Sequence, residues 1–244
     1  MPSSPLAFSL VIAVMDEEDN MAPLVREIAD ALAGSDPARA EVIFVDDGSR
    51  DGTVAALAAQ RSVLPGLRIV RHDRNYGKST ALRTGIHAAR HDIVVTMDGD
   101  LQNDPTDLFA LLAPFERDAG LGLVAGQRIK REDRWSKRIA SRIANRLRRR
   151  LLKDGARDSV CGWKAMRREL YLVLPFFDNM HRFLIALAIR EGSRIALVDV
   201  RDRRRVHGRS KYTNWGRLVV GIPDLLGVIW LARRFRGQPE TKEL

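Results

Sequence analysis

The sequence V-V-T-M-D-G-D-L-Q-N-D-P, residues 94–105, decides the fold that we expect for this chain. The apolar run 93–97 ends abruptly in Asp98-Gly99-Asp100, which is typical of a buried strand that delivers two carboxylates to its carboxyl end. Asp100 and Gln102 offer oxygen ligands suited to a hard divalent cation such as Mg²⁺ or Mn²⁺. A cation there would neutralise charge on a departing diphosphate, although Asp-x-Asp alone is a weak motif.

Similar apolar runs alternate with helical spacing on both sides of this stretch. We expect strands at 6–15, 41–45, 67–70, 93–97 and 121–125, and helices at 20–33, 53–61, 77–90 and 106–119. This alternation predicts an α/β domain whose mostly parallel sheet is layered by helices.

Acidic residues follow three of the expected strands. They are Asp16 and Glu17, Asp46 and Asp47, and Asp98 and Asp100. A single acidic loop is often only a solvated turn. Because ligands gather beyond the carboxyl ends of parallel strands, three such loops together indicate one shared site.

Charge and cysteine content narrow the class of protein. The formal net charge of +10 implies an anionic partner, which could be a nucleic acid, an acidic membrane surface or a phosphorylated small molecule. The single cysteine, Cys161, excludes an internal disulfide and a cysteine-rich zinc site, and it is best explained as a small packed residue. Residues 1–5 lack the basic start of a signal peptide, so we expect a cytosolic location.

The stretch 135–153 has a different character. Apolar residues recur there every four positions, basic residues fill the gaps, and no acidic residue interrupts it. Such a basic amphipathic helix is typical of a membrane surface, and a core-packing helix with a solvated basic face is the alternative. A nucleic-acid patch is disfavoured because the arginine-rich run 146–150 has no interleaved aromatic residues.

The remainder of the chain predicts a strand at 160–166, a helix at 180–190, an edge strand at 194–200 and a second basic cluster at 201–211. The apolar segment 218–232 is interrupted by Gly221, Pro223, Asp224 and Gly227 and falls short of the ~20 residues that span a bilayer. It could lie in the membrane interface or dock on a membrane partner. We therefore expect a catalytic domain over 6–212, a docking segment over 213–236 and a tail over 237–244.

Four motifs occur in order along the chain. They are V-I-A-V-M-D-E-E-D-N (11–20), V-D-D-G-S (45–49), N-Y-G-K-S-T-A-L-R-T-G (75–85) and M-D-G-D-L-Q-N-D-P (97–105). Together they resemble the family 2 glycosyltransferases of the GT-A fold. With G-Q-R at 126–128 and R-V-H-G-R-S-K-Y at 205–212, the chain is similar to the polyprenyl-phosphate branch, typified by dolichol-phosphate mannose synthase. The resemblance covers residues 8–230.

The resemblance implies a role for each matching residue. Ala13, Met15 and Glu17 would hold the nucleotide base, Val45 and Asp47 the nucleotide, Asp98 and Gly99 the nucleotide-sugar, and Asp100 with Gln102 the metal. Asp100, Arg128 and Arg205 would be the catalytic residues, with the two arginines on phosphates and with Lys211 and Arg182 as further phosphate contacts. The family's first loop normally begins P-x-Y-N-E. This chain keeps Glu17 but departs at Ala13, Met15 and Asp16, so GDP and UDP donors both stay open.

The implied activity is inverting transfer of a sugar from a nucleotide-sugar to polyprenyl phosphate at the cytosolic face of a membrane. A lipid phosphate is already an anionic nucleophile at neutral pH, so no general base is needed. In agreement, none of the five histidines shows a pairing with a nucleophile in the sequence, and Gly77-Lys78-Ser79-Thr80 lacks the first glycine of a P-loop, since His72 stands there.

Two alternatives stay open at this point. A saccharide or lipopolysaccharide acceptor would need a carboxylate base, for which Asp158 is the candidate. An inactive, membrane-docked subunit would explain the altered first loop. The sequence leaves open whether a membrane-protein partner or a second copy of the chain binds the protein.

Overall fold

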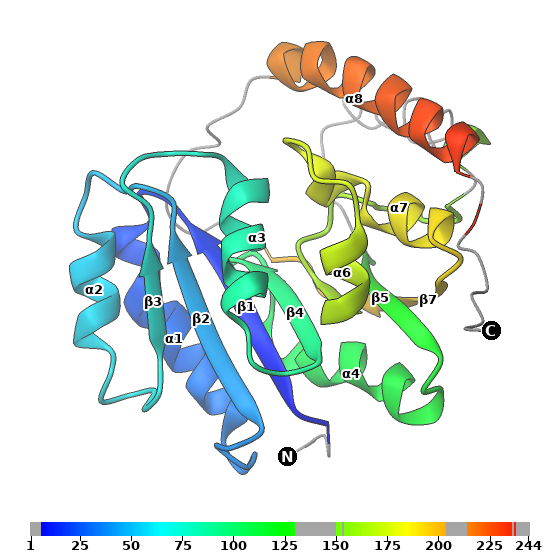
Figure 1. The fold of residues 1–244 in the computed structure, drawn as a ribbon. Coiled ribbons are helices and arrows are strands. Elements are labelled where there is room, and N and C mark those ends of the chain that lie inside the picture. The colour runs from blue at the N-terminus through cyan, green and yellow to red at the C-terminus, as the bar shows by residue number, and fades with distance from the viewer. Residues whose placement is uncertain (1–5, 130–149, 153, 204–213, 236, 238–244) are drawn as a thin grey trace, which may run out of the picture.

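The computed structural model describes residues 6–129, 150–152, 154–203, 214–235 and 237 (Figure 1). The strands are β1 (Phe8–Val14), β2 (Ala40–Asp46), β3 (Arg68–Arg71), β4 (Ile93–Asp98), β5 (Leu121–Arg128), β6 (Lys164–Arg167) and β7 (Arg194–Val200). The helices are α1 (Glu18–Leu32), α2 (Thr53–Ala59), α3 (Lys78–Ala88), η1 (Pro105–Asp107), α4 (Leu108–Arg117), α6 (Arg168–Val173), η2 (Met180–Arg182), α7 (Leu184–Arg190) and α8 (Asn214–Arg234).

The strands form one sheet in the order β3-β2-β1-β4-β6-β5-β7. The first four strands are mutually parallel, β6 runs antiparallel to both of its neighbours, and β7 pairs parallel with β5 at the edge. The predicted α/β fold with a mostly parallel sheet is therefore confirmed, as is the edge position of β7.

Each face of the sheet has its own hydrophobic core. Along β1, Leu10 and Ile12 join α1 and α4 in one cluster, whereas Val11 joins α3 and α7 in the other. This alternation follows from the two-residue period of a strand that is covered on both faces. Gly85 lets α3 lie close to the sheet, because a Cβ there would stand 2.3 Å from Val11 Cγ1.

Two predicted elements are shorter than the pattern indicated. The predicted strand 160–166 is wrong for its first half, since β6 begins only at Lys164, and α6 was not expected. The segment before β6 packs against Asp98 of the site, since a Cβ on Gly162 would lie 2.4 Å from Asp98 Oδ1. The predicted helix 180–190 is divided into η2 and α7, and Asn179 before it takes a left-handed backbone with φ 64°.

The segment 218–232 lies within α8, which is one continuous helix through Pro223. Packing stabilises α8, because Val228 is buried and Leu225 packs with it against the core that contains α7. In the part of the chain that the structure describes, no helix has the length and apolar character needed to cross a bilayer. The predicted basic helix 135–153 and basic cluster 201–211 lie mostly outside the described residues, apart from the helical residues 150–152 and the segment 201–203.

Candidate active site

The three acidic strand ends meet at the carboxyl edge of the sheet. Ala13 of β1 pairs with Val45 of β2 on one side and with Asp98 of β4 on the other, so these three predicted site residues form one row across adjacent strands. The Val45 side chain is fully buried in the core with α3. Only its backbone could meet a nucleotide, and its predicted role stays a prediction.

The first loop is fixed in place although it departs from the family pattern. Asp16 donates its backbone N–H to Ser49 Oγ at 2.8 Å and accepts the Arg50 N–H at 2.8 Å. Glu17 donates its N–H to Thr53 Oγ1 at 2.9 Å. These bonds join the loop after β1 to the loop after β2, so the edge of the site is ordered at the predicted positions.

Asp47 organises the turn before α3. Its carboxylate accepts the N–H groups of Tyr76 at 2.9 Å and Gly77 at 2.8 Å, and it contacts His72 Nδ1 at 2.8 Å. His72 Nε2 lies 2.9 Å from Thr84 Oγ1. Asp47 thus positions the start of α3, and direct contact of Asp47 with a nucleotide stays a prediction.

Asp98 forms an ion pair with Lys78 at the first residue of α3. Burial disfavours ionisation of Asp98, but the cations Lys78, Lys164 and Arg128 outweigh it and hold the pKa of Asp98 below its ordinary value. Sequence reasoning missed Lys78 as a site residue because it was considered only as part of a false P-loop. Its position at the start of a helix that follows a strand was the available signal.

The expected metal ligands lie in the turn that follows β4. Asp100 is only 8% exposed and accepts the Gln102 N–H at 3.2 Å, while Gln102 donates its side-chain amide to the Arg203 carbonyl at 3.4 Å. Leu101 between them has a left-handed φ of 61°, an uncommon conformation that a bulky residue keeps only where surrounding structure enforces it.

Among the described residues, no cluster of three or more His, Cys, Asp or Glu side chains could hold a metal by itself. Mg²⁺ is commonly bound by one or two carboxylates with substrate phosphates completing its shell. The carboxylate of Asp100 and the amide oxygen of Gln102 therefore fit a cation that is shared with a diphosphate.

Arg128 at the end of β5 is held by two acids. Its Nε donates to Asp158 Oδ2 at 2.5 Å, and its Nη1 lies 3.7 Å from Asp202 Oδ1. Burial opposes the charge of Arg128, but these carboxylates raise its pKa further above the ordinary value. A permanently charged guanidinium is thus fixed beside the site, while Asp158 is engaged as its partner and not as a free base.

The segment after β7 runs beside the metal loop. Arg203 donates its N–H to the Gln102 carbonyl at 2.9 Å, and its side chain bridges Asp104 and Glu27 at 2.8 and 2.7 Å. The predicted phosphate ligands Arg205 and Lys211 follow this segment directly but lie outside the described residues.

A second layer lies beneath Asp98. His181 Nδ1 is 2.8 Å from Ser79 Oγ, so the expectation that no histidine pairs with a nucleophilic side chain is wrong. Ser79 is fully buried, however, and burial, with Lys78, Lys164 and Arg182 nearby, lowers the pKa of His181 well below its ordinary value. This pair is therefore a neutral packing contact between α3 and η2.

Two further groups complete this layer. The Nε atom of Arg182 is buried and has no hydrogen-bond partner among the residues that the structure describes. Burial raises the pKa of the Cys161 thiol to about 11, which makes it an inert packed group, in agreement with the sequence analysis.

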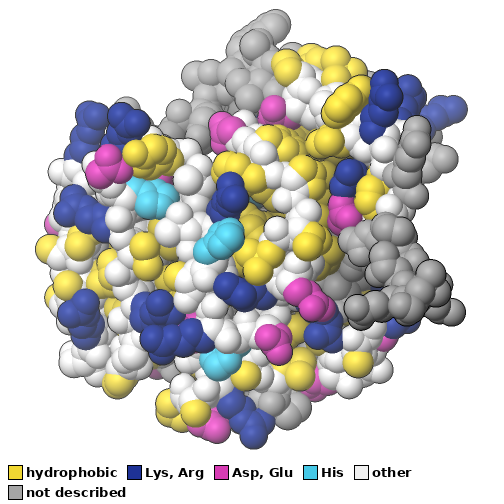
Figure 2. Space-filling view, in the orientation of Figure 1, with side chains coloured by type: hydrophobic (Ala, Val, Ile, Leu, Met, Phe, Trp, Pro, Cys, Tyr) yellow, Lys and Arg dark blue, Asp and Glu magenta, His cyan; other side chains and the backbone are white. Residues whose placement is uncertain are grey.

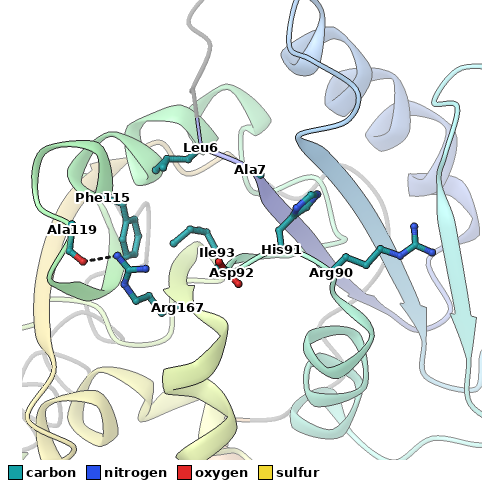
Figure 3. Close-up of a pocket in the computed structure, with 9 residues that line it drawn as sticks. All are labelled: Leu6, Ala7, Arg90, His91, Asp92, Ile93, Phe115, Ala119 and Arg167. Atoms are coloured by element: carbon teal, nitrogen blue, oxygen red, sulfur yellow. Dashed lines mark hydrogen bonds between the residues drawn. The ribbon is translucent and has the colours of Figure 1, made fainter.

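A separate hollow of about 340 Å³ lies at the opposite, amino edge of the sheet (Figure 3). It is bordered by Ala7 just before β1, by Ile93 at the start of β4, and by Phe115 of α4. Arg167 points into it but donates to the carbonyl of Leu121 at 3.0 Å and to that of Ala119. This hollow holds none of the predicted site residues.

Comparison with known proteins agrees with this geometry. Residues 9–173 match the model of the family described as "Glycosyl transferase family 2", so the chain belongs to glycosyl transferase family 2. It is 37% identical over 98% of its length to dodecaprenyl-phosphate galacturonate synthase of Rhizobium johnstonii, of which it covers 70%. It is 34% identical over 84% of its length to undecaprenyl-phosphate 4-deoxy-4-formamido-L-arabinose transferase of Edwardsiella ictaluri, and it spans only 62% of that relative.

Solved structures support the fold. Glucosyl-3-phosphoglycerate synthase from Mycobacterium tuberculosis, in complex with Mn²⁺, UDP and phosphoglyceric acid, superposes with a TM-score of 0.72 at 23% identity. The match covers 97% of this chain and 81% of that protein. The predicted family, its GT-A fold and the similarity to polyprenyl-phosphate sugar transferases are therefore confirmed.

Proposed function

We propose that this chain transfers a sugar from a nucleotide-sugar to polyprenyl phosphate, with inversion at the sugar C1 and with a divalent cation as cofactor. The observation that carries the proposal is the convergence of Asp98, the Asp100–Gln102 turn and the fixed Arg128 at one sheet edge. The names of the two relatives, which both act on a polyprenyl phosphate, support the acceptor class.

Each group has a defined task in the proposed reaction. Asp98 binds the donor, Asp100 and Gln102 hold the cation, and Arg128 binds a phosphate with its planar fork of donors. The cation supplies Lewis-acid stabilisation of the diphosphate leaving group. An oxygen of the acceptor phosphate attacks C1 from the opposite side, the bond from C1 to the diphosphate breaks, and no proton has to be removed.

The Arg128–Asp158 ion pair bears on the choice of acceptor. A saccharide hydroxyl would need a general base, yet the candidate base Asp158 already accepts from Arg128 Nε and from the Val160 N–H at 3.1 Å. A carboxylate whose oxygens are engaged in this way is poorly placed to take a proton from an acceptor. A phosphate acceptor, which needs no base, therefore fits the site better than a saccharide.

Radiolabelled nucleotide-sugars with undecaprenyl phosphate and Mg²⁺ test the proposal. We expect a lipid-linked product with at least one donor and none after EDTA treatment. Failure of every common UDP- and GDP-linked donor to label the lipid would refute the proposed activity. Asp158→Asn alone is a poor discriminator between acceptors, because it also releases Arg128.

Helix α8 suggests how the enzyme reaches a lipid acceptor. It lies across the helix layer of α7 (Figure 1), and its outward side carries Ile222, Leu226 and Trp230, which are 52%, 61% and 58% exposed. Figure 2 shows hydrophobic side chains gathered on the upper part of this face, over α8. The helix ends in Arg233 and Arg234. An apolar stripe followed by cations fits the interface of an anionic membrane. We propose that α8 lies in this interface on the cytosolic face of the membrane.

Vesicle sedimentation tests the membrane assignment. Leu226→Ser combined with Trp230→Ser removes two exposed apolar side chains, and we expect binding to anionic vesicles to fall at least 10-fold. The matched control is Val63→Ser, since Val63 is exposed at 38% far from α8 along the chain. Unchanged partitioning of the double variant would show that the stripe does not enter lipid.

A further inference from the structure

A short backbone pairing joins the segment after β7 to the turn after β4. Residues 201–203, the strap, meet residues 99–103, the metal turn, at an antiparallel bridge between Asn103 and Asp202. Beside this bridge the Arg203 N–H donates to the Gln102 carbonyl at 2.9 Å, and the Gln102 side-chain amide donates back to the Arg203 carbonyl at 3.4 Å. The strap thus takes the amide nitrogen of Gln102, which leaves the amide oxygen as the atom for a cation.

The Arg203 guanidinium fastens the strap a second time. Its Nη2 lies 2.8 Å from Asp104 Oδ2, and its Nη1 lies 2.7 Å from Glu27 Oε2 of α1. Burial opposes the charge of Arg203, but these two carboxylates outweigh it and raise the pKa of the guanidinium. Asp104 is only 5% exposed and accepts the Thr106 N–H at 3.0 Å, so it is itself fixed at the start of η1. One side chain therefore joins the strap to α1 and to the residue that follows the metal turn.

The metal turn needs contacts of this kind to keep its shape. Leu101, between the two expected metal ligands, has a φ of 61°, which a leucine keeps only where its surroundings enforce it. Its side chain is buried, and Asn103 Oδ1 accepts the Asp98 N–H at 3.0 Å across the turn. Return of Leu101 to an ordinary backbone would turn Asp100 away from Gln102, because the two flank it. The strap, which binds Gln102 and Asn103, opposes that change.

The strap also reaches the arginine that we expect on a phosphate. Asp202 Oδ1 lies 3.7 Å from Arg128 Nη1 at the end of β5, and the same residue forms the bridge to Asn103. The strap therefore contacts both the turn with the cation ligands and the fixed guanidinium. Its position sets the spacing between these two parts of the proposed site.

We propose that Arg203 is a positioning residue, which clamps the strap to the metal turn so that Asp100 and Gln102 keep the spacing that a divalent cation needs. This inference rests on the proposed function and adds to it a residue that acts through Gln102. The guanidinium of Arg203 is used on Glu27 and Asp104, and not on the substrate. Groups that orient the ligands of a metal typically contribute about 10- to 100-fold to its affinity.

Titration calorimetry with Mn²⁺ in the presence of UDP or GDP tests the inference. Arg203→Gln should raise the Kd of Mn²⁺ about 10-fold. Arg203→Lys keeps the charge but replaces a planar fork by a point charge, and Glu27→Gln removes only the partner on α1, so each should raise it about 3-fold. The matched control is Arg194→Gln, since Arg194 at the start of β7 forms an exposed ion pair with Asp118 at 2.6 Å. This control should leave the Kd unchanged.

Two further measurements separate positioning from general stability. The side chains of Arg203 and Glu27 are 40% and 36% exposed, and exposed ion pairs add little to stability, so the thermal midpoint of Arg203→Gln should stay within about 3 °C of the wild type. In the metal-free protein, amide hydrogen exchange over residues 98–104 should be about 5-fold faster in Arg203→Gln than in Arg194→Gln. An unchanged Kd of Mn²⁺ in Arg203→Gln, no tighter binding in Arg203→Lys than in Arg203→Gln, or unaccelerated exchange over 98–104 would overturn the inference.

Transfer to undecaprenyl phosphate is measured separately. Weaker Mn²⁺ binding in Arg203→Gln, with no lipid product even from the wild type, would refute the proposed activity and leave the positioning role standing. A lipid product from the wild type, with Mn²⁺ binding that does not respond to Arg203→Gln, would refute the positioning role and leave the activity standing. Failure of the wild type to bind Mn²⁺ with either nucleotide would refute both.

Discussion

Two carboxylates at opposite ends of the strands, the buried Glu41 and the half-buried Asp98, have different surroundings. Glu41, near the start of β2, accepts from Ser9 Oγ at 2.6 Å and from the Arg90 N–H at 3.0 Å, and it pairs with Arg68. Asp98, at the end of β4, has Lys78, which is partly exposed, and a second lysine below it.

The difference separates a structural acid from a functional one. Both side chains have a lowered pKa against the cost of burial, so charge alone does not distinguish them. Glu41 has several mutually fixed partners, so its network is complete. Asp98 has one partly exposed partner, Lys78, and borders a small cavity, so its network is open to a ligand. A hydrogen-bond and ion-pair network that is open in this way can accept a polar group of a substrate.

The largest expected effect is on the rate of sugar transfer, at Asp100 beside the carboxyl end of β4. Asp100→Asn should lower the rate of sugar transfer by about 1000-fold, about 4 kcal/mol, because it weakens the cation that stabilises the leaving group. Transfer rates with saturating Mg²⁺ measure this, and the thermal midpoint should not fall. Asp199→Asn, on the exposed Arg157–Asp199 pair, is the matched control. A loss below 10-fold would remove Asp100 from the metal site.

A substitution at Glu41 should change the stability of the protein and not its activity. Glu41→Gln should lower the free energy of unfolding by about 2 kcal/mol, because hydrogen bonds to a charged group are lost at a buried position. Urea denaturation measures this, with the exposed Asp36→Asn, a partner of Arg39, as control. If transfer by the folded protein fell and stability did not, the two carboxylates would not differ as we infer.

Gly162→Ala tests whether the Asp98 carboxylate needs the space that a glycine leaves at position 162. A Cβ there would lie 2.4 to 2.7 Å from the Asp98 carboxylate, so that carboxylate must move. We expect the donor Kd to rise about 10-fold, which is about 1.4 kcal/mol. Gly227→Ala is the control, since nothing lies within 4 Å of its added Cβ. Donor binding that is as tight as in the wild type would show that Asp98 is not positioned through Gly162.

The smallest expected effect is the contribution of Glu41 to the pH dependence of the unfolding free energy. The folded pKa of Glu41 is lowered, so its contribution to stability is present above about pH 4.5 and is lost as pH falls through the folded pKa. Between those pH values the wild type should lose unfolding free energy faster than Glu41→Gln, which lacks the titrating group. Parallel curves from acid-range urea titrations would contradict this.

Much of the fold follows from local pattern. The periods of apolar residues predicted the alternating strands and helices as far as β5, and the acidic ends of β1, β2 and β4 do converge. Failures cluster after residue 154, where β6 is short and antiparallel and where η2 interrupts a helix. In both places the chain contacts residues of the site, and the local spacing of apolar residues does not predict such contacts.

Strand periodicity and motif spacing were sufficient to predict the α/β class, the family and the position of Asp98 and Asp100 at a strand end, because both are local properties of the chain. Only the tertiary structure brought Lys164 under Asp98, engaged Asp158 with Arg128, and joined Ser79 to His181 across 102 residues. These contacts depend on strand order and on how helices pack on the sheet, which long-range burial decides.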